Sequence, residues 1–154
     1  MMMQLSCDVI RSLQGRTLVT AESCTGGGIG AALTAVPGSS AVYKGGIISY
    51  VNAVKAELLK VDPCMLDEIG AVSAPVAEAM ATGVRQLLCA DVAVSVTGLA
   101  GPGCDDYANP VGTVYIGYSD NFHTISVRYL FSGNREQVRE QAVKAALDLI
   151  LKEQ

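Results

Sequence analysis

The sequence predicts an α/β fold, in which a mixed β-sheet carries helices on both of its faces. The first observation is that segments with helical and strand-like patterns alternate along the chain, which is typical of this fold class. The second is that several strand-like segments are short, continuous apolar runs, as expected for strands covered on both faces. The chain has 154 residues and half of them are hydrophobic, so we expect residues 1–154 to form one domain with a substantial core.

The first half of the chain gives helix, strand, helix, strand and helix in turn. Leu5–Gln14 has apolar residues at helical spacing, whereas Thr17–Ala21 is a short apolar run that suits a buried strand. Thr25–Val36 begins in glycines and ends before a proline, which indicates a helix. Ala41–Val51 is rich in β-branched and aromatic residues and is predicted to be a strand. Asn52–Val61 returns to a helical pattern, and its first residue is the predicted N-cap.

The middle of the chain continues with two helical segments, a strand and a long loop. A short helical turn is predicted to start at Asp62. A longer helix is predicted over Ser73–Leu88, with Ser73 as its cap and a proline in its first turn. Val92–Thr97 is a third apolar run and a buried strand. The glycine-rich segment Gly98–Pro110 is long for a loop in a compact domain, and such loops are often functional.

The end of the chain is predicted to form a hairpin and a helix. Gly112–Tyr118 and Phe122–Phe131 are strand-like and are joined by the bridge Ser119–Asn121, which indicates an antiparallel pair. Asn134–Lys152 has apolar residues on one side at helical spacing, which predicts a closing amphipathic helix.

Composition and charge exclude several classes of protein. The formal net charge is −4 and the basic residues are scattered from Arg11 to Lys152, so a nucleic-acid partner is not expected. No apolar run reaches the roughly 18 residues of a bilayer-spanning helix, and the N-terminus lacks the pattern of a secretion signal. The five cysteines form no C-x-x-C pair, which excludes a disulfide framework and a zinc ribbon. We therefore expect a cytoplasmic chain with reduced thiols and no membrane contact.

The run AESCTGGGIG places glycines between the first strand and the next helix. A helix start of this kind presents unpaired N–H groups that favour anions and oxyanions. Gly26, Gly28 and Ala31 have the spacing of a dinucleotide-binding fingerprint, but residues 46–52 lack the acidic residue that it requires. A phosphate loop needs a lysine after the glycines, and none follows. A third interpretation is nucleophilic catalysis by Ser23, and spacing alone leaves it open against simple helix capping by the same serine.

A catalytic serine needs a general base. His123 is the only histidine, and its place near the hairpin turn favours a solvated side chain. Lysine acts as a base when burial lowers its pKa, and the nearby candidates are Lys44, Lys55 and Lys60. Lys55 falls in the first turn of a predicted helix, where the helix dipole opposes a cation and helps to lower the pKa of its amine. The residues alone leave open whether Lys55 is a base or a solvated lysine.

Six segments, taken together and in order, resemble the CinA C-terminal domain family, which comprises the nicotinamide-nucleotide amidohydrolases, also called nicotinamide mononucleotide deamidases. The segments are TAESCTGGGIGAALTAVPGSS, YKGGIISYVNAVKAELLKV, GAVSAPVAEAMATGVR, SVTGLAGPG, NPVGTVYIGY and FSGNREQVREQA. The resemblance covers about residues 5–150 and implies a three-layer α/β/α sandwich with a mixed five-stranded sheet that includes a β-hairpin. Many family members carry a further N-terminal domain, and we expect the standalone form here.

The resemblance implies hydrolysis of the carboxamide of nicotinamide mononucleotide to nicotinate mononucleotide and ammonia, in the pyridine nucleotide cycle. It implies a metal-free serine–lysine mechanism that uses no cofactor. The family's nucleophile falls on Ser23, its lysine on Lys55, and a supporting tyrosine on Tyr50. The expected substrate-binding residues are Thr25, Gly26, Gly27, Gly28, Asn52, Thr97, Gly98, Gly101 and Arg139.

Within that set, three roles are expected. Arg139 would contact the substrate phosphate or stabilise charge in the site, and Thr97–Pro102 would form the opposite wall of the pocket. The N–H groups of the Gly26–Gly28 turn would hold the oxyanion. The implied partner is a small-molecule pyridine nucleotide, and the apolar composition permits a homodimer or another homo-oligomer.

The loop GPGCDDYANPVGT departs from the family pattern, because Cys104, Asp105, Asp106 and Tyr107 replace small or differently charged residues. Two added acids beside a phosphate site would weaken the binding of a nucleotide. This departure supports a rival interpretation, in which the chain is a non-catalytic nucleotide-binding module or a competence/damage-related regulatory module. A lysine Nζ within hydrogen-bond reach of the serine Oγ would favour the enzyme.

Overall fold

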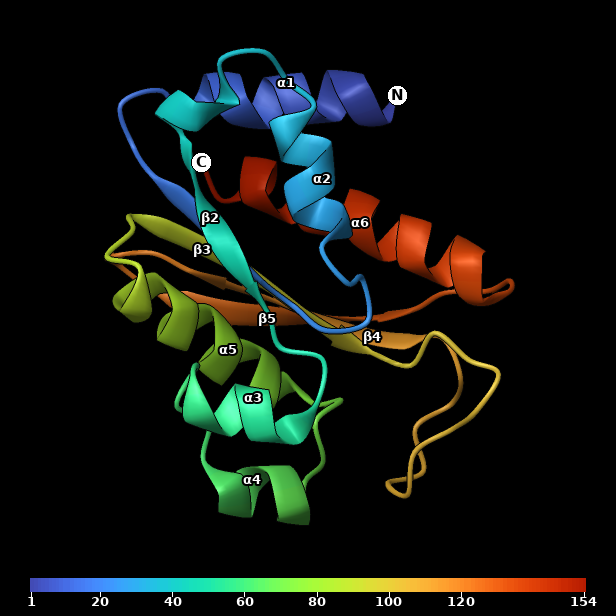
Figure 1. The fold of residues 1–154 in the computed structure, drawn as a ribbon. Helices are drawn as coiled ribbons and strands as arrows, with labels where there is room; N and C mark the ends of the chain where they lie inside the picture. The colour runs from blue at the N-terminus through green and yellow to red at the C-terminus, as the bar shows by residue number, and fades with distance from the viewer.

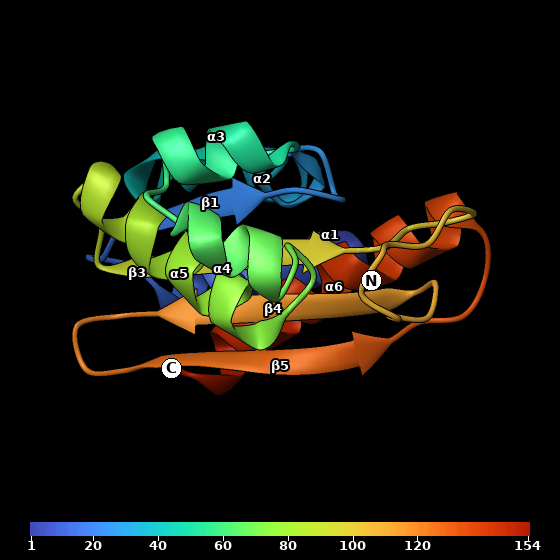
Figure 2. The same cartoon turned by 90° about the horizontal axis from the view of Figure 1, so that it is seen from below.

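The computed structural model describes residues 1–154 and contains one five-stranded β-sheet. The strands are β1 (Leu18–Glu22), β2 (Tyr43–Ile48), β3 (Val92–Gly98), β4 (Thr113–Ser119) and β5 (Thr124–Leu130). Their order in the sheet is β2-β1-β3-β4-β5. β1 is parallel to β2 and β3. β4 is antiparallel to both β3 and β5 (Figure 2). The mixed sheet confirms the predicted fold class, and β4 and β5 form the predicted hairpin.

Helices cover both faces of the sheet, which gives three layers (Figure 1). One face carries α1 (Met2–Ser12), α2 (Gly28–Thr34) and α6 (Arg135–Lys152). The other face carries α3 (Asn52–Glu57), α4 (Pro63–Glu68) and α5 (Ala74–Leu87). A short 3-10 helix, Ser39–Ala41, precedes β2. None of these helices is both long and apolar enough to cross a bilayer.

Each face of the sheet has its own hydrophobic core. The larger core joins α1, α2 and α6 to the sheet through residues such as Leu18, Leu33 and Ile150. The smaller core packs α5 and the segment after α3 against β1, through residues that include Val19 and Leu59. All five residues of β1 are buried, because side chains alternate along a strand and those of β1 enter both cores in turn.

Two predicted boundaries near the glycine-rich run are wrong. The strand predicted over Ala41–Val51 is shorter, because the chain is a 3-10 helix before Tyr43 and leaves the sheet after Ile48. The helix predicted from Thr25 begins instead at Gly28. Residues 26 and 27 adopt positive φ angles of 59° and 103°, so they form a left-handed turn that glycine adopts without strain.

The helix that carries Lys55 is also shorter than expected. α3 ends at Glu57 rather than Val61, and Lys60 has a φ of 60°, which a continuous α-helix does not allow. Asn52 is the first helical residue, and Val51 holds the N-cap position predicted for Asn52.

The two other predicted helix starts in this layer differ in how they are capped. The Asp62 carboxylate accepts the Cys64 N–H at 2.9 Å and caps α4. Ser73 does hold the N-cap position of α5, but its hydroxyl donates to Gly70 O at 2.9 Å and makes no cap bond. The local sequence therefore predicted where these two helices start better than it predicted the bonds that cap them.

Candidate active site

Ser23 and Lys55 come together from two different layers of the fold. Ser23 directly follows β1, and its N–H donates to the Val96 carbonyl of β3 at 3.0 Å. Because successive side chains of a strand point to opposite faces, Ser23 faces the layer of α3, α4 and α5. Lys55 reaches it from α3, and the distance from Lys55 Nζ to Ser23 Oγ is 3.1 Å.

The surroundings of Lys55 stabilise its neutral form relative to that of a lysine in water. The residue is only 1% exposed, and no carboxylate pairs with it. Burial lowers the pKa of Lys55 from 10.5 to about 8, and the neighbouring Cys24 opposes the shift. The Nζ also contacts the carbonyls of Ser49 at 2.8 Å and Tyr50 at 3.3 Å. When these carbonyls take the N–H groups of a neutral amine, its lone pair is left for the Ser23 hydroxyl proton.

An open pocket of about 580 Å³ lies over this pair, within the size range of small-molecule sites. Tyr50 and Asn52 line it from the connection between β2 and α3. Thr97, Gly98 and Gly101 line it from the end of β3 and the loop that follows. The structure thus brings these predicted site residues around Ser23 and Lys55.

The structure places the predicted oxyanion site at the glycines outside the pocket. Thr25, Gly26, Gly27 and Gly28 form the turn behind Ser23 and do not line the pocket. The Gly26 N–H donates to Ser23 O and the Gly28 N–H to Thr25 O, each at 3.0 Å. Two of the three glycine N–H groups are thus used within the turn, and the Gly27 N–H, which has no partner within the chain, lies outside the pocket.

Arg139 also lies outside the pocket, on the far side of the same turn. Its Nε donates to Cys24 O at 3.0 Å and its Nη2 to Thr25 O at 3.3 Å. Its guanidinium is therefore bound to the backbone of the protein, rather than placed in the pocket as expected.

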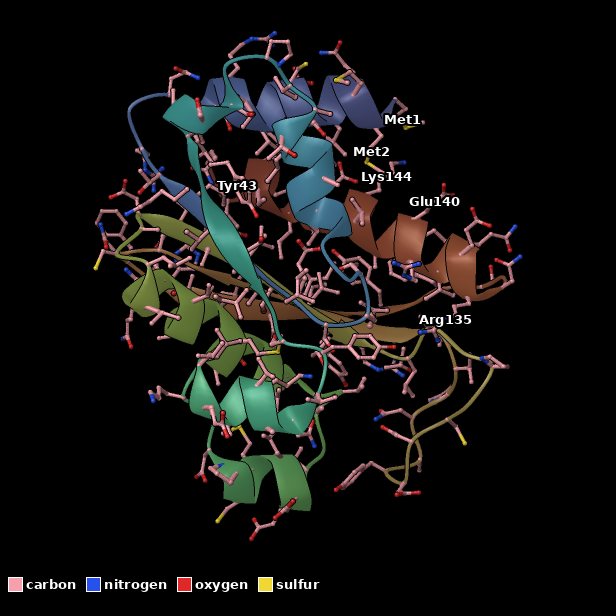
Figure 3. All side chains as sticks on the ribbon, in the orientation of Figure 1. Met1, Met2, Tyr43, Arg135, Glu140 and Lys144 are labelled. Carbon is pink, nitrogen blue, oxygen red and sulfur yellow. The ribbon has the colours of Figure 1, made fainter.

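Arg135, which the sequence reasoning missed, is the arginine that lines the pocket. Its Nη1 donates to Gly101 O at 2.7 Å and its Nη2 to the Tyr50 hydroxyl at 2.9 Å. Arg135 lies at the start of α6 beside the loop (Figure 3), where a capping box of Asn134 and Gln137 fixes the helix. Arg135 and Arg139 are one helical turn apart in the segment FSGNREQVR, so spacing does not show which of them reaches the pocket.

The two residues that flank Ser23 were missed as well. Glu22 is 2% exposed, and its carboxylate accepts the N–H groups of Ile29 at 2.8 Å and Gly30 at 3.0 Å at the start of α2. Cys24 lines the pocket, and its N–H makes no hydrogen bond within the chain. The N–H that follows a nucleophile is a common oxyanion donor. Burial raises the pKa of the Cys24 thiol to about 11, so the thiol is neutral and Ser23 remains the candidate nucleophile.

His123 lies at the turn between β4 and β5, at the opposite end of the sheet from Ser23 (Figure 2). Its Nε2 is 2.8 Å from a Glu153 carboxylate oxygen, and its Nδ1 is 3.4 Å from one of Asp120. His123 therefore does not serve Ser23 as a base. No group of three or more His, Cys, Asp or Glu side chains gathers where it could hold a metal ion.

One of the two added acids helps to fold the loop after β3. Asp105 accepts hydrogen bonds from the N–H of Tyr107 at 3.1 Å and from the side-chain amide of Asn109 at 2.7 Å. Burial alone would raise the pKa of Asp105, but these hydrogen bonds hold it below its usual value. The Tyr107 hydroxyl donates to Asp67 O at 2.6 Å and ties the loop to α4. Asp105 is thus held by hydrogen bonds within the loop, whereas Asp106 is exposed.

Comparisons with known proteins agree on one family. The model of the CinA C-terminal domain matches residues 3–154. A nicotinamide-nucleotide amidohydrolase, PncC of Pseudomonas putida, is 48% identical over 134 residues, which cover 87% of this chain and 84% of that protein. A CinA-like protein of Thermosynechococcus vestitus is 50% identical over 147 residues, which cover 92% of this chain and 35% of that protein. The chain thus spans about a third of the length of the CinA-like relatives that it matches.

Solved structures of similar proteins have the same fold. The competence damage-inducible protein A of Klebsiella pneumoniae superposes with a TM-score of 0.96 at 34% identity, covering 99% of this chain and 96% of that one. A competence-damaged protein (CinA) superfamily member of Escherichia coli gives 0.97 at 31% identity, covering 100% and 91%.

Proposed function

The chain belongs to the CinA C-terminal domain family, and from that premise we propose that it is an amidohydrolase that deamidates nicotinamide mononucleotide. The products are nicotinate mononucleotide and ammonia. The observation that carries the proposal is the 3.1 Å contact between Lys55 Nζ and Ser23 Oγ beside an open pocket. The name of the Pseudomonas putida relative, which is similar over most of both chains, supports the class of substrate.

The first half of the proposed reaction forms an acyl-enzyme. Neutral Lys55 takes the hydroxyl proton of Ser23 as Oγ attacks the carboxamide carbon. The Cys24 N–H, which has no partner within the chain, donates to the oxyanion on the amide oxygen. Protonated Lys55 then gives its proton to the amide nitrogen, the C–N bond breaks, and ammonia leaves.

The second half releases the acid. Lys55, neutral again, takes a proton from water as the water oxygen attacks the acyl carbon, and it returns that proton to Ser23 Oγ as the ester bond breaks. A base in both halves needs a pKa near the working pH. The pKa of about 8 that burial gives Lys55 meets that requirement.

We assign recognition of the substrate phosphate to Arg135 in place of Arg139. Arginine suits phosphate because its planar guanidinium offers several N–H donors in a fixed geometry. The bonds of Arg135 to Gly101 O and the Tyr50 hydroxyl orient the guanidinium at the pocket and leave its other donors for a ligand. Tyr50 then supports the site by holding Arg135, and Asn52 contributes to the same wall.

The decisive experiment measures ammonia release from nicotinamide mononucleotide by the wild type and by Ser23→Ala and Lys55→Met variants. Ser23→Ala should abolish release with the fold intact by circular dichroism. Lys55→Met should lower kcat by at least the roughly 10²–10⁴-fold that general acid–base groups contribute.

Two exposed residues provide matched controls. Ser40 and Lys144 lie outside the pocket, so Ser40→Ala and Lys144→Met should keep the wild-type rate. Near-normal turnover by Ser23→Ala would contradict the serine mechanism. If the wild type binds nicotinamide mononucleotide but releases no ammonia, the chain is a nucleotide-binding module and the proposed activity is wrong.

A further inference from the structure

Two groups of opposite charge, Glu22 and Arg139, hold the turn that carries Ser23. Glu22 and Ser23 are neighbours, and their side chains point to opposite faces of the sheet. Ser23 meets Lys55 on one face, whereas the Glu22 carboxylate meets the start of α2 on the other. Arg139 approaches the same turn from α6. We call residues 23–28 the nucleophile turn.

Glu22 binds the hydrogen-bond donors of the nucleophile turn and of the helix after it. One carboxylate oxygen accepts the Thr25 hydroxyl at 2.7 Å and the Ile29 N–H at 2.8 Å, and the other accepts the Gly30 N–H at 3.0 Å. A Cβ on Gly30 would lie 2.8 Å from the Tyr43 hydroxyl, so glycine permits this close packing. A buried carboxylate is stable only when hydrogen bonds satisfy it in this way.

Arg139 binds the carbonyl side of the nucleophile turn. Its guanidinium donates to the carbonyls of Cys24 and Thr25 at 3.0 and 3.3 Å. A Cβ on Gly28 would lie 2.9 Å from a methyl group of Val143, which shows how closely α2 and α6 approach here. The turn is thus fixed to α6 as well as to α2.

The folded turn fixes the direction of the peptide group between Ser23 and Cys24. Ser23 O accepts the Gly26 N–H inside the turn, and the C=O and N–H of a trans peptide point in opposite directions. The Cys24 N–H, which belongs to the same peptide, is therefore directed away from the turn. Cys24 lines the pocket, so we infer that this free donor faces the pocket.

We propose that Glu22 and Arg139 are positioning residues, which hold the nucleophile turn so that Ser23 Oγ stays within reach of Lys55 and the Cys24 N–H stays free. Arg139 then contacts the protein backbone and no substrate. The inference rests on the proposed function only in that Ser23 is the nucleophile.

The first test does not depend on the substrate. A fluorophosphonate, a general serine-directed probe, is reacted with each variant, and mass spectrometry measures the rate at which it modifies Ser23. Glu22→Gln and Arg139→Met should each slow the modification by about 10- to 100-fold, as expected when a reacting atom is misplaced by about 1 Å. Glu22→Asp keeps the carboxylate and should recover part of the rate.

The matched control separates positioning from loss of stability. Leu33 is buried in α2 but makes no contact with the nucleophile turn through a hydrogen bond. Leu33→Ala should lower Tm and leave the modification rate of Ser23 within about threefold of wild type. If Leu33→Ala slows the modification as much as Glu22→Gln at equal Tm, the proposal is wrong.

Steady-state kinetics distinguish positioning from substrate contact. Arg139→Met should lower kcat for nicotinamide mononucleotide with KM nearly unchanged, whereas a phosphate ligand would show a raised KM. A raised KM with an unchanged modification rate of Ser23 overturns the proposal for Arg139. If the wild type is modified at Ser23 but releases no ammonia, only the proposed function fails.

Crystal structures of Glu22→Gln and Arg139→Met give a readout that needs no reactivity. The proposal expects the Ser23 Oγ to Lys55 Nζ distance to increase beyond hydrogen-bond reach in both variants. An unchanged distance of 3.1 Å in both would overturn the proposal even if the probe does not modify the wild type.

Discussion

In the proposed mechanism, the environment of Lys55 sets the pH dependence of the reaction. The amine must be neutral to take the proton of Ser23, and burial brings its pKa to about 8. The neutral fraction rises with pH until that pKa is passed. We therefore predict that kcat/KM rises by about tenfold per pH unit below pH 7 and levels off above roughly pH 9. Ammonia release at constant ionic strength measures the profile.

The direction of this pH dependence is the informative result. A protonated lysine acting as an acid in the first step would make the rate fall as pH rises through 8. The Cys24 thiol does not contribute to this pH dependence, because its pKa of about 11 keeps it neutral over this range. A flat or falling profile would rule out neutral Lys55 as the base.

Arg135 gives a second prediction, which concerns recognition of the substrate phosphate. Arg135→Met should raise KM for nicotinamide mononucleotide by about tenfold or more, because a charge-assisted bond to phosphate is worth roughly 1.5–3 kcal/mol. Nicotinamide riboside has the same carboxamide and no phosphate, so its KM should not change in this variant. Equal effects on both substrates would show that Arg135 acts elsewhere in the site.

The sequence identified some of the candidate site residues and left the roles of others undecided. Ser23 stood out because it lies between an apolar strand and a glycine run, and both features are local. Lys55 was left undecided on the residues alone, since its burial and its 3.1 Å contact with Ser23 Oγ come from packing between layers. Arg135 and Arg139 are both part of the matched segment, and only the contacts of α6 show which one reaches the pocket.

Among the elements, the start of α6 has the most direct link to the site, because Arg135 is its first residue. The Asn134 side chain accepts the Gln137 N–H at 2.9 Å, and the Gln137 side chain accepts the Asn134 N–H at 2.8 Å. Asn134→Ala should lower the free energy of unfolding by about 1 kcal/mol, the usual cost of losing a cap. Urea titration measures the change, and Asn134→Ser, which can still cap, should recover most of it.

The sequence predicted which helices and strands exist better than it predicted where each of them begins and ends. Periodicity and apolar runs identified every strand and each of the longer helices, because these patterns reflect the face that each element buries. The predicted start of α2 was wrong because no local side chain caps the helix. Its first N–H groups are satisfied by Glu22, which lies several residues earlier at the end of β1. A cap supplied from outside the helix leaves no signal in local spacing.

For the molecule as a whole, the geometry of the candidate site depends on how two layers are held together. Ser23 is fixed to the sheet, whereas Lys55 belongs to the helical layer on one face. The smaller core joins them, because Leu59 and Val61 follow Lys55 and pack with β1 and α5. The Val61 N–H also donates to Lys55 O at 3.1 Å. The contact between α5 and the segment after α3 is therefore expected to control the distance between Lys55 and Ser23.

Gly83 of α5 tests this dependence, because a Cβ there would collide with the backbone of Leu59. Helix propensity alone predicts that Gly83→Ala stabilises the protein by about 1 kcal/mol. Overpacking costs roughly 1–3 kcal/mol, so we expect a net loss of stability together with a fall in kcat. Gly117→Ala is the matched control, since its Cβ would collide with the Ala77 backbone of the same helix. If both variants lose similar stability in urea titration but only Gly83→Ala loses kcat, the position of α3 limits the reaction.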